Sequence, residues 1–198
     1  MLNLKKTPVW AIVLGVVVLI VLWIVSSYNS IINVQAEVQN AWAQVEVQYQ
    51  RRADLIPQLV GTVEGAADFE KSTLTAVTEA RTNWLNTSQD PNASFQDQIA
   101  SANSFDSALS RLLVTVESYP TLTATDTFKT LQSQLEGTEN RVAVARKDFN
   151  DVAKVYNVKI RRVPMNFFAK AFGFEEYPFF ESTQGSEVAP TVEFDFSE

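Results

Sequence analysis

The 198-residue chain contains no cysteine and no histidine. These absences exclude disulfides, cysteine nucleophiles, zinc sites built on Cys or His, and every catalytic triad that uses an imidazole. They also exclude the carboxylate-bridged di-iron bundle, which needs a Glu-x-x-His motif. The remaining carboxylates, lysines, serines and tyrosines form no recognisable catalytic motif. We therefore expect no enzymatic activity, no metal site and no cofactor.

Basic residues are missing from the end of the chain. Residues 175–198 hold seven acids and no base, whereas residues 1–174 hold 16 side chains of each sign. Residues 175–198 thus carry the whole net charge of −7. Nucleic acid is not expected as a partner, because phosphate binding needs a basic surface.

Charged residues are also absent between Lys6 and Glu37. The interval opens with an apolar run over residues 9–28, and about 20 apolar residues suffice to span the hydrocarbon of a bilayer. Trp10 and Trp23 stand near its two ends, where interfacial aromatic residues are expected. A cleaved signal peptide is the alternative, but its apolar core would be about 7–15 residues long with a cleavage site directly after it. We predict an uncleaved transmembrane helix over residues 9–28.

The flanking charges predict the orientation of this helix. Lys5 and Lys6 precede it, and no base follows until Arg51. By the positive-inside rule, residues 1–8 are cytoplasmic and the body is periplasmic or extracellular. Membrane lipids are therefore predicted partners, and the bacterial inner membrane is the predicted location.

A heptad pattern predicts a helix that packs against other helices from about Ser30 to Gly65. Its seam consists of Ile31, Gln35, Val38, Trp42, Val45, Tyr49, Arg52, Ile56, Leu59, Val63 and Ala66. Arg52 falls on this seam, and a buried arginine must be paired or it costs several kcal/mol. Pro57 removes a backbone donor and predicts a kink one turn later. Two interpretations of Arg52 and Pro57 are open. They are a structural arginine and a tolerated kink, or they belong to a recognition or hinge element.

Three further helices are expected, over about 68–85, from Ser94 to Pro120, and to Val163. Capping boxes at residues 94–97 and 123–126 mark the starts of the third and fourth helices of the bundle. The predicted fold is all-α: a transmembrane helix followed by an antiparallel four-helix bundle over residues 30–163, with long first and fourth helices. These two helices form a stalk between the bilayer and a four-helix head.

Counted from the membrane, Arg52 lies about 33 Å up the first helix, level with the region of Glu139 on the fourth. We predict a structural ion pair between Arg52 and Glu139.

The fourth helix leads into an aromatic segment over residues 164–180. If that helix returns to the membrane, Phe167, Phe168 and Phe172 sit at the membrane interface, and Arg161 and Arg162 can meet anionic lipid. Alternatively, the aromatic residues simply cover the base of the bundle.

The tail, residues 181–198, ends in an alternating segment with Val192, Phe194 and Phe196 on one side. Off-seam apolar residues of the stalk, such as Ile32, Val34, Ala41 and Leu55, would be exposed on a two-helix stalk, which monomers rarely tolerate over large areas. We predict a homo-oligomer, a ring by the symmetry of parallel anchors, in which the tail adds by strand pairing. The alternative is a monomer with a loose tail.

Several motifs carry a family resemblance. Residues 49–60, YQRRADLIPQLV, resemble the hallmark of the LemA family of bacterial membrane proteins. Later motifs follow in the expected order, at residues 117–120 (ESYP), 139–141 (ENR), 145–150 (ARKDFN), 155–157 (VYN) and 179–181 (FFE). The chain departs from the pattern in having Val163 where an aromatic residue is expected before the proline.

The resemblance implies a helical domain behind a membrane helix and gives no biochemical activity. Relatives linked to magnetosome membrane formation imply a role in membrane organisation. We expect a non-enzymatic, membrane-anchored scaffold that self-associates and organises partners or membrane. The alternative is a sensing or binding module that presents a helical groove to a ligand or to a partner membrane protein of unknown identity.

Overall fold

A computed structural model describes residues 9–65 and 69–181. This part of the chain is helical and contains no strand. The helices are α1 (Val9–Glu64), α2 (Lys71–Gln89), α3 (Phe95–Val116), the short α4 (Pro120–Thr123), α5 (Asp126–Arg161) and α6 (Met165–Ala171). The predicted all-α class is confirmed.

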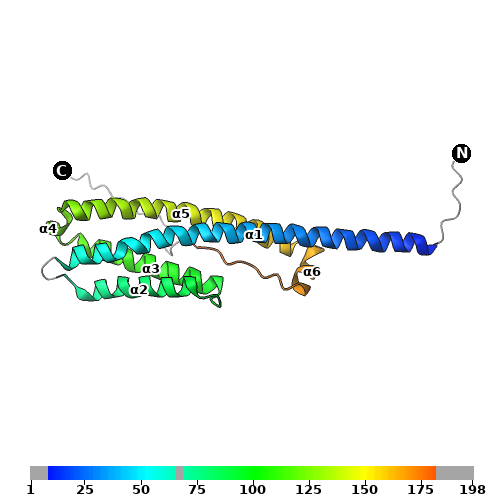
Figure 1. Ribbon diagram of the computed structural model, residues 1–198, viewed down its shortest axis with the longest axis horizontal. Helices are drawn as coiled ribbons and strands as arrows, with labels where there is room; N and C mark the ends of the chain where they lie inside the picture. The colour runs from blue at the N-terminus through cyan, green and yellow to red at the C-terminus, as the bar shows by residue number, and fades with distance from the viewer. Residues whose placement is uncertain (1–8, 66–68, 182–198) are drawn as a thin grey trace, which may run out of the picture.

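The helix α1 joins the apolar N-terminal region to the bundle without a break (Figure 1). Among the described residues it is the one helix long and apolar enough to cross a membrane, with a mean hydropathy of 2.7 in its most apolar window. Side chains there are exposed, whereas the predicted seam is buried from Ile31 to Val63 except for half-buried Gln35. Ala66 lies outside the described residues.

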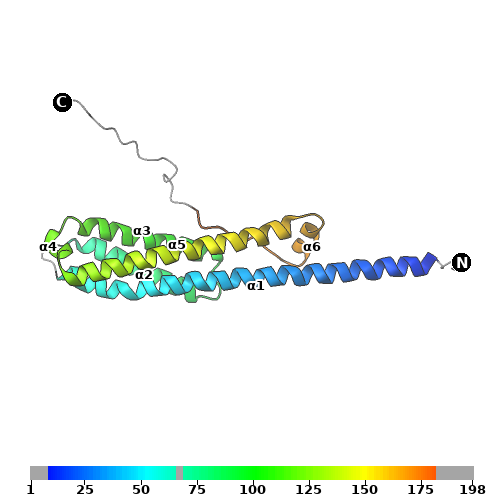
Figure 2. The same cartoon turned by 90° about the horizontal axis from the view of Figure 1, so that it is seen from above.

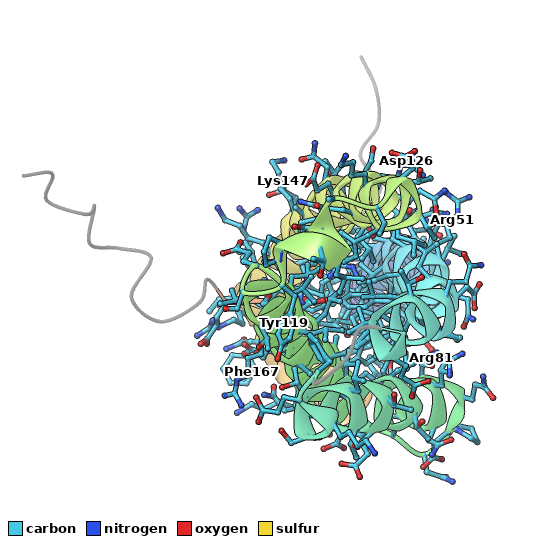
Figure 3. The ribbon with its side chains drawn as sticks, turned by 90° about the vertical axis from the view of Figure 1, so that its left-hand side faces the viewer. Arg51, Arg81, Tyr119, Asp126, Lys147 and Phe167 are labelled. Carbon is cyan, nitrogen blue, oxygen red and sulfur yellow. The ribbon has the colours of Figure 1, made fainter. Side chains whose placement is uncertain are left out.

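The bundle is antiparallel and has two well-packed helix pairs. α1 packs most extensively against α5, and α2 against α3 (Figures 1 and 2). The α2–α3 pair is shorter, so α1 and α5 continue past it toward α6. Viewed from the α4 end, side chains fill the centre while Arg51, Asp126 and Lys147 point outward (Figure 3).

Several predicted boundaries are wrong for identifiable reasons. α2 begins at Lys71 and continues to Gln89, beyond the predicted end at residue 85, and stops at Asp90, directly before Pro91. The N-cap of α5 is Thr125, whose hydroxyl accepts from the Phe128 amide, while the preceding turn forms α4. α5 ends at Arg161, and Val163 is exposed because the buried stripe shifts to Ala153 and Ile160. The capping box of Ser94 and Asp97 is present as predicted.

Pro57 lies inside α1, which continues for two more turns to Glu64. Proline has no amide hydrogen, so the carbonyl of Ala53 loses its normal helical donor four residues on. The guanidinium Nε of Arg81 supplies that donor from α2, at 2.7 Å from the Ala53 oxygen. Pro57 therefore opens a docking point for α2 on α1. The predicted kink stays a prediction.

An extended segment, residues 174–181, leaves α6 and runs back along the bundle; we call it the strap (Figure 1). It begins after Gly173, whose φ of 75° suits glycine. Asn157 donates to the Tyr177 carbonyl at 2.8 Å and accepts from its amide at 2.9 Å. Asn150 makes the same pair of bonds with Phe180, at 2.8 and 3.0 Å. Two asparagines on α5 thus hold the strap by its backbone.

The strap covers a side of the stalk that was expected to be bare. Tyr177 is buried against Phe95 and Tyr156, and Phe180 stacks on Trp42. The predicted aromatic segment, residues 164–180, therefore divides into two parts. Its first part contains α6, which lies beside α1, and its second part places Tyr177 and Phe180 of the strap in the bundle core. The stalk consists of two helices and a strap.

The hydrogen bond between Arg81 and Ala53 gives a double-mutant test. Arg81→Met should lower the free energy of unfolding by about 1–3 kcal/mol, because it leaves a carbonyl without a donor. In a Pro57→Ala background the restored amide satisfies that carbonyl, so the same change should cost clearly less. Chemical unfolding of the detergent-solubilised protein, followed by circular dichroism, measures both values. Equal costs in the two backgrounds would contradict the proposed role of Pro57.

Candidate functional site

The centre of the head contains a buried positive charge. Arg52, on the α1 seam, is 1% exposed. Its Nη1 donates to Asp106 Oδ1 on α3, and its Nη2 donates to Glu139 Oε2 on α5 at 2.6 Å. One guanidinium therefore bridges α1, α3 and α5. Its Nε is buried without a hydrogen-bond partner among the described residues.

A second arginine completes the cluster around Asp106. Arg146 of α5 donates to Asp106 Oδ2 and to the hydroxyl of Tyr49, and to Asn103 Oδ1 at 3.1 Å. The Tyr49 hydroxyl itself donates to Asp106 Oδ2 at 2.7 Å. We call Tyr49, Arg52, Asp106, Glu139 and Arg146 the ion cluster. Its two arginines and two carboxylates balance in charge.

The electrostatics of the cluster keep Tyr49 protonated. Burial raises the pKa of Tyr49 well above its usual range, and the neighbouring Asp106 carboxylate raises it further. The two arginines oppose this effect but do not reverse it. Tyr49 is thus a hydrogen-bond donor in the core, and a tyrosinate nucleophile is disfavoured.

A groove opens beside the ion cluster, between α3 and α5. It has a volume of about 370 Å³. Its apolar floor includes Leu109, Leu113, Val116, Phe128 and Leu135, and its polar edge includes Arg52, Asp106, Glu117, Glu136 and Glu139. We call it the head groove. The strap lies along the same α3–α5 side of the bundle, nearer to α6.

The predicted contact between Arg52 and Glu139 is present in the structure, but Glu139 is not the more buried of the two carboxylates that bind Arg52. The side chain of Glu139 is 71% exposed, whereas that of Asp106 is 21% exposed. The more buried partner of Arg52 is therefore Asp106, which sequence reasoning missed. The signal was its position directly after the seam residue Phe105 on α3, facing a charged seam position.

Some of the residues predicted at the membrane interface come together where α6 meets α1. The Phe168 ring meets Trp23 at 6.0 Å between centroids, and Phe172 meets Tyr28 at 5.2 Å. Phe167 is exposed on the same short helix. Membrane contact of these rings remains a prediction.

The other predicted membrane-facing residues are spread along the molecule. Trp10 is exposed at the far end of α1. Arg161 forms an ion pair of 3.4 Å with Glu176, and Arg162 caps the end of α5. Val192, Phe194 and Phe196 of the tail lie outside the described residues.

Among the described residues, no group of three or more acidic side chains could hold a metal ion. The carboxylates of the ion cluster are instead matched by arginines. Such an arrangement can hold helices in register and can shape the groove beside it.

Comparison with known proteins gives a consistent picture. The LemA family model matches residues 41–194. Magnetosome protein MamQ 2 of Paramagnetospirillum magneticum is 28% identical over 94% of this chain and 77% of its own length. Magnetosome protein MamQ of Magnetospirillum gryphiswaldense is 27% identical over 81% of this chain and 67% of its own. Protein LemA of Metamycoplasma hominis is 24% identical, covering 81% and 71%.

The two carboxylates around Arg52 should differ in their effect on stability. Asp106→Asn leaves a buried guanidinium undercompensated and should cost about 3–5 kcal/mol. Glu139→Gln removes an exposed partner and should cost about 0–1 kcal/mol. Thermal and urea unfolding of the purified protein would measure both. Equal losses for the two variants would mean that the charge of Arg52 is shared evenly between α3 and α5.

Proposed function

The chain belongs to the LemA family, and from that premise we propose that it is a non-catalytic, membrane-anchored scaffold whose head stands on the bilayer at two points. The first point is the apolar part of α1. The second is α6, which lies on the surface of the membrane. The names of its relatives support a membrane-associated helical protein, and two of them are magnetosome proteins.

The observation that carries this proposal is the packing of α6 against the end of the apolar run of α1. Phe168 contacts Trp23, which belongs to the predicted span, while Phe167 on the same helix is 70% exposed. A short helix with an exposed aromatic ring at this height is suited to the region between headgroups and acyl chains. Lys170 and Arg162, both exposed, stand beside it and suit anionic lipid.

Rigid connection supports the scaffold role over that of a tethered enzyme. Lys159 of α5 donates to the Ser30 carbonyl at 2.7 Å, which fixes the lower end of α5 to α1. Because α1 is continuous from the predicted span into the head, no flexible linker separates these two parts of α1. The ion cluster is charge-balanced and offers no activated nucleophile, which supports a non-catalytic role.

Self-association is part of the proposal. Ile32 is exposed, whereas Val34, Ala41 and Leu55 pack against the core, so the off-seam residues of α1 offer less apolar surface than expected. The better support comes from α5, where Val144, Val155 and Val158 are exposed. We propose that these valines meet a neighbouring copy, and that parallel anchors favour a ring.

The seat of α6 can be measured with a single introduced label, because the chain has no cysteine of its own. A spin label on Phe167→Cys, in full-length protein in lipid vesicles, should report membrane depth by collisions with oxygen and exclusion of a polar nickel complex. A label on Val114→Cys, an exposed position on α3 far from α6, is the matched control and should report water.

Equal accessibility of the two labels to the nickel complex would remove α6 from the membrane. The Val114→Cys protein also tests the proposed orientation, with the N-terminus cytoplasmic and the head outside. A membrane-impermeant maleimide should reach this cysteine in intact spheroplasts. Labelling only after lysis would reverse the orientation.

The oligomer has its own test. Mass photometry of full-length protein in mild detergent should show assemblies larger than a monomer, and Val155→Glu with Val158→Glu should shift them toward monomers. Val114→Glu places the same charge on a different helix and should leave assembly unchanged. A protein shortened after Gly185 tests the tail separately. A monomer for the unaltered protein would end the proposal of a ring.

A further inference from the structure

The α3–α5 side of the bundle has two parts that differ in what covers them. Toward α6, the strap fills it, and its peptide units are held by Asn150 and Asn157. Toward α4, the head groove lies beside the same two helices with no strap over it. One continuous side of the bundle therefore receives an extended segment at one end and remains open at the other.

The open part suits apolar side chains. Leu109 and Val116 of α3 and Leu135 of α5 are buried there, while Leu113 is half-buried and borders the groove. The volume of about 370 Å³ is within the lower range of sites that bind compact ligands or a few side chains of a peptide. Loose packing between α3 and α5 leaves this space, since each of these helices packs mainly on another partner.

The charge at the edge of the groove selects its occupant. Four lining carboxylates, from Asp106, Glu117, Glu136 and Glu139, stand against one lining cation, Arg52. Arg52 is already bound by Asp106 and Glu139. Glu117 and Glu136 are exposed and form no ion pair within the described residues. The groove therefore presents an apolar floor with an excess of negative charge.

The chain's own tail is long enough to reach the groove but has the wrong charge. From Asn150, beside the end of the strap, to Leu135 is about 22 Å along α5, which about seven extended residues can cover. Seventeen residues follow Glu181. They contain Glu187, Glu193, Asp195 and Glu198 and no base, so like charges oppose their entry.

We propose that the head groove is a docking site for a segment of another protein that carries apolar side chains flanked by lysine or arginine. The apolar side chains occupy the floor between α3 and α5. The bases face Glu117 and Glu136 at the edge. The inference goes beyond the scaffold role, because it does not depend on the seat of α6 in the membrane.

The test uses full-length protein in nanodiscs of zwitterionic phosphatidylcholine, with three short fluorescent peptides. One alternates leucine and lysine, one alternates leucine and glutamate, and one has the sequence of residues 191–198. Fluorescence anisotropy should show binding of the basic peptide, at least about tenfold tighter than either acidic peptide and weakened by added salt. Empty nanodiscs correct for adsorption to lipid.

Two variants locate the binding. Ser110→Trp places a bulky ring at the groove and should abolish binding, whereas Ser107→Trp, on the α2-facing side of α3, should leave it unchanged. Glu117→Lys with Glu136→Lys changes only exposed residues and should weaken the basic peptide by about tenfold or more. Circular dichroism confirms that each variant is folded.

Three results would overturn the proposal: no binding of the basic peptide, binding of the residue 191–198 peptide with equal or higher affinity, or binding that Ser110→Trp leaves unaltered. The second result would assign the groove to the chain's own tail. None of these results bears on the depth of Phe167, so failure of the docking proposal and failure of the membrane-seated scaffold are distinguishable.

Discussion

The fold depends on one charge that cannot reach water. Arg52 is 1% exposed, and removing such a charge from water costs several kcal/mol unless it is matched. The match comes from two different helices, Asp106 on α3 and Glu139 on α5. Sliding α3 by one turn would separate the guanidinium from Asp106, its more buried partner, and leave the charge undercompensated. The apolar seam brings the helices together, and the charge selects one register among those that the seam allows.

The second constraint acts one turn further along α1, at Pro57. The carbonyl that Pro57 leaves free accepts from Arg81, so α2 is positioned by a backbone defect in α1. Arg52 and Pro57 together give α1 one polar contact with each of the other three long helices, besides the apolar packing of the seam. The head can therefore be assembled around one short stretch of α1.

Sequence periodicity predicts what is periodic in this molecule. The seam of α1 and the partnership of Arg52 with Glu139 follow from counting residues along two antiparallel helices. Asp106 could not be derived in this way, because its height depends on where the α2–α3 pair begins and ends. The strap has no period at all. Its only signal is a pair of spacings: seven residues separate Asn150 from Asn157 on the helix, and three separate Tyr177 from Phe180 on the strap. The two distances match, because seven helical residues and three extended residues each span about 10 Å.

The strap also explains why the two ends of the α3–α5 side differ. The α2–α3 pair ends at the level of Phe149, where the ring of Phe95 at the start of α3 still packs on it. Toward α6 the strap completes the cover, with Phe180 on Phe149 and Tyr177 on Tyr156. Nearer α4 all four long helices are present, and the ion cluster supports the space between α3 and α5 from within. The groove is present without an occupant, beside a cluster of paired charges. For the partner segment proposed above, a groove that is already open lowers the entropic cost of binding.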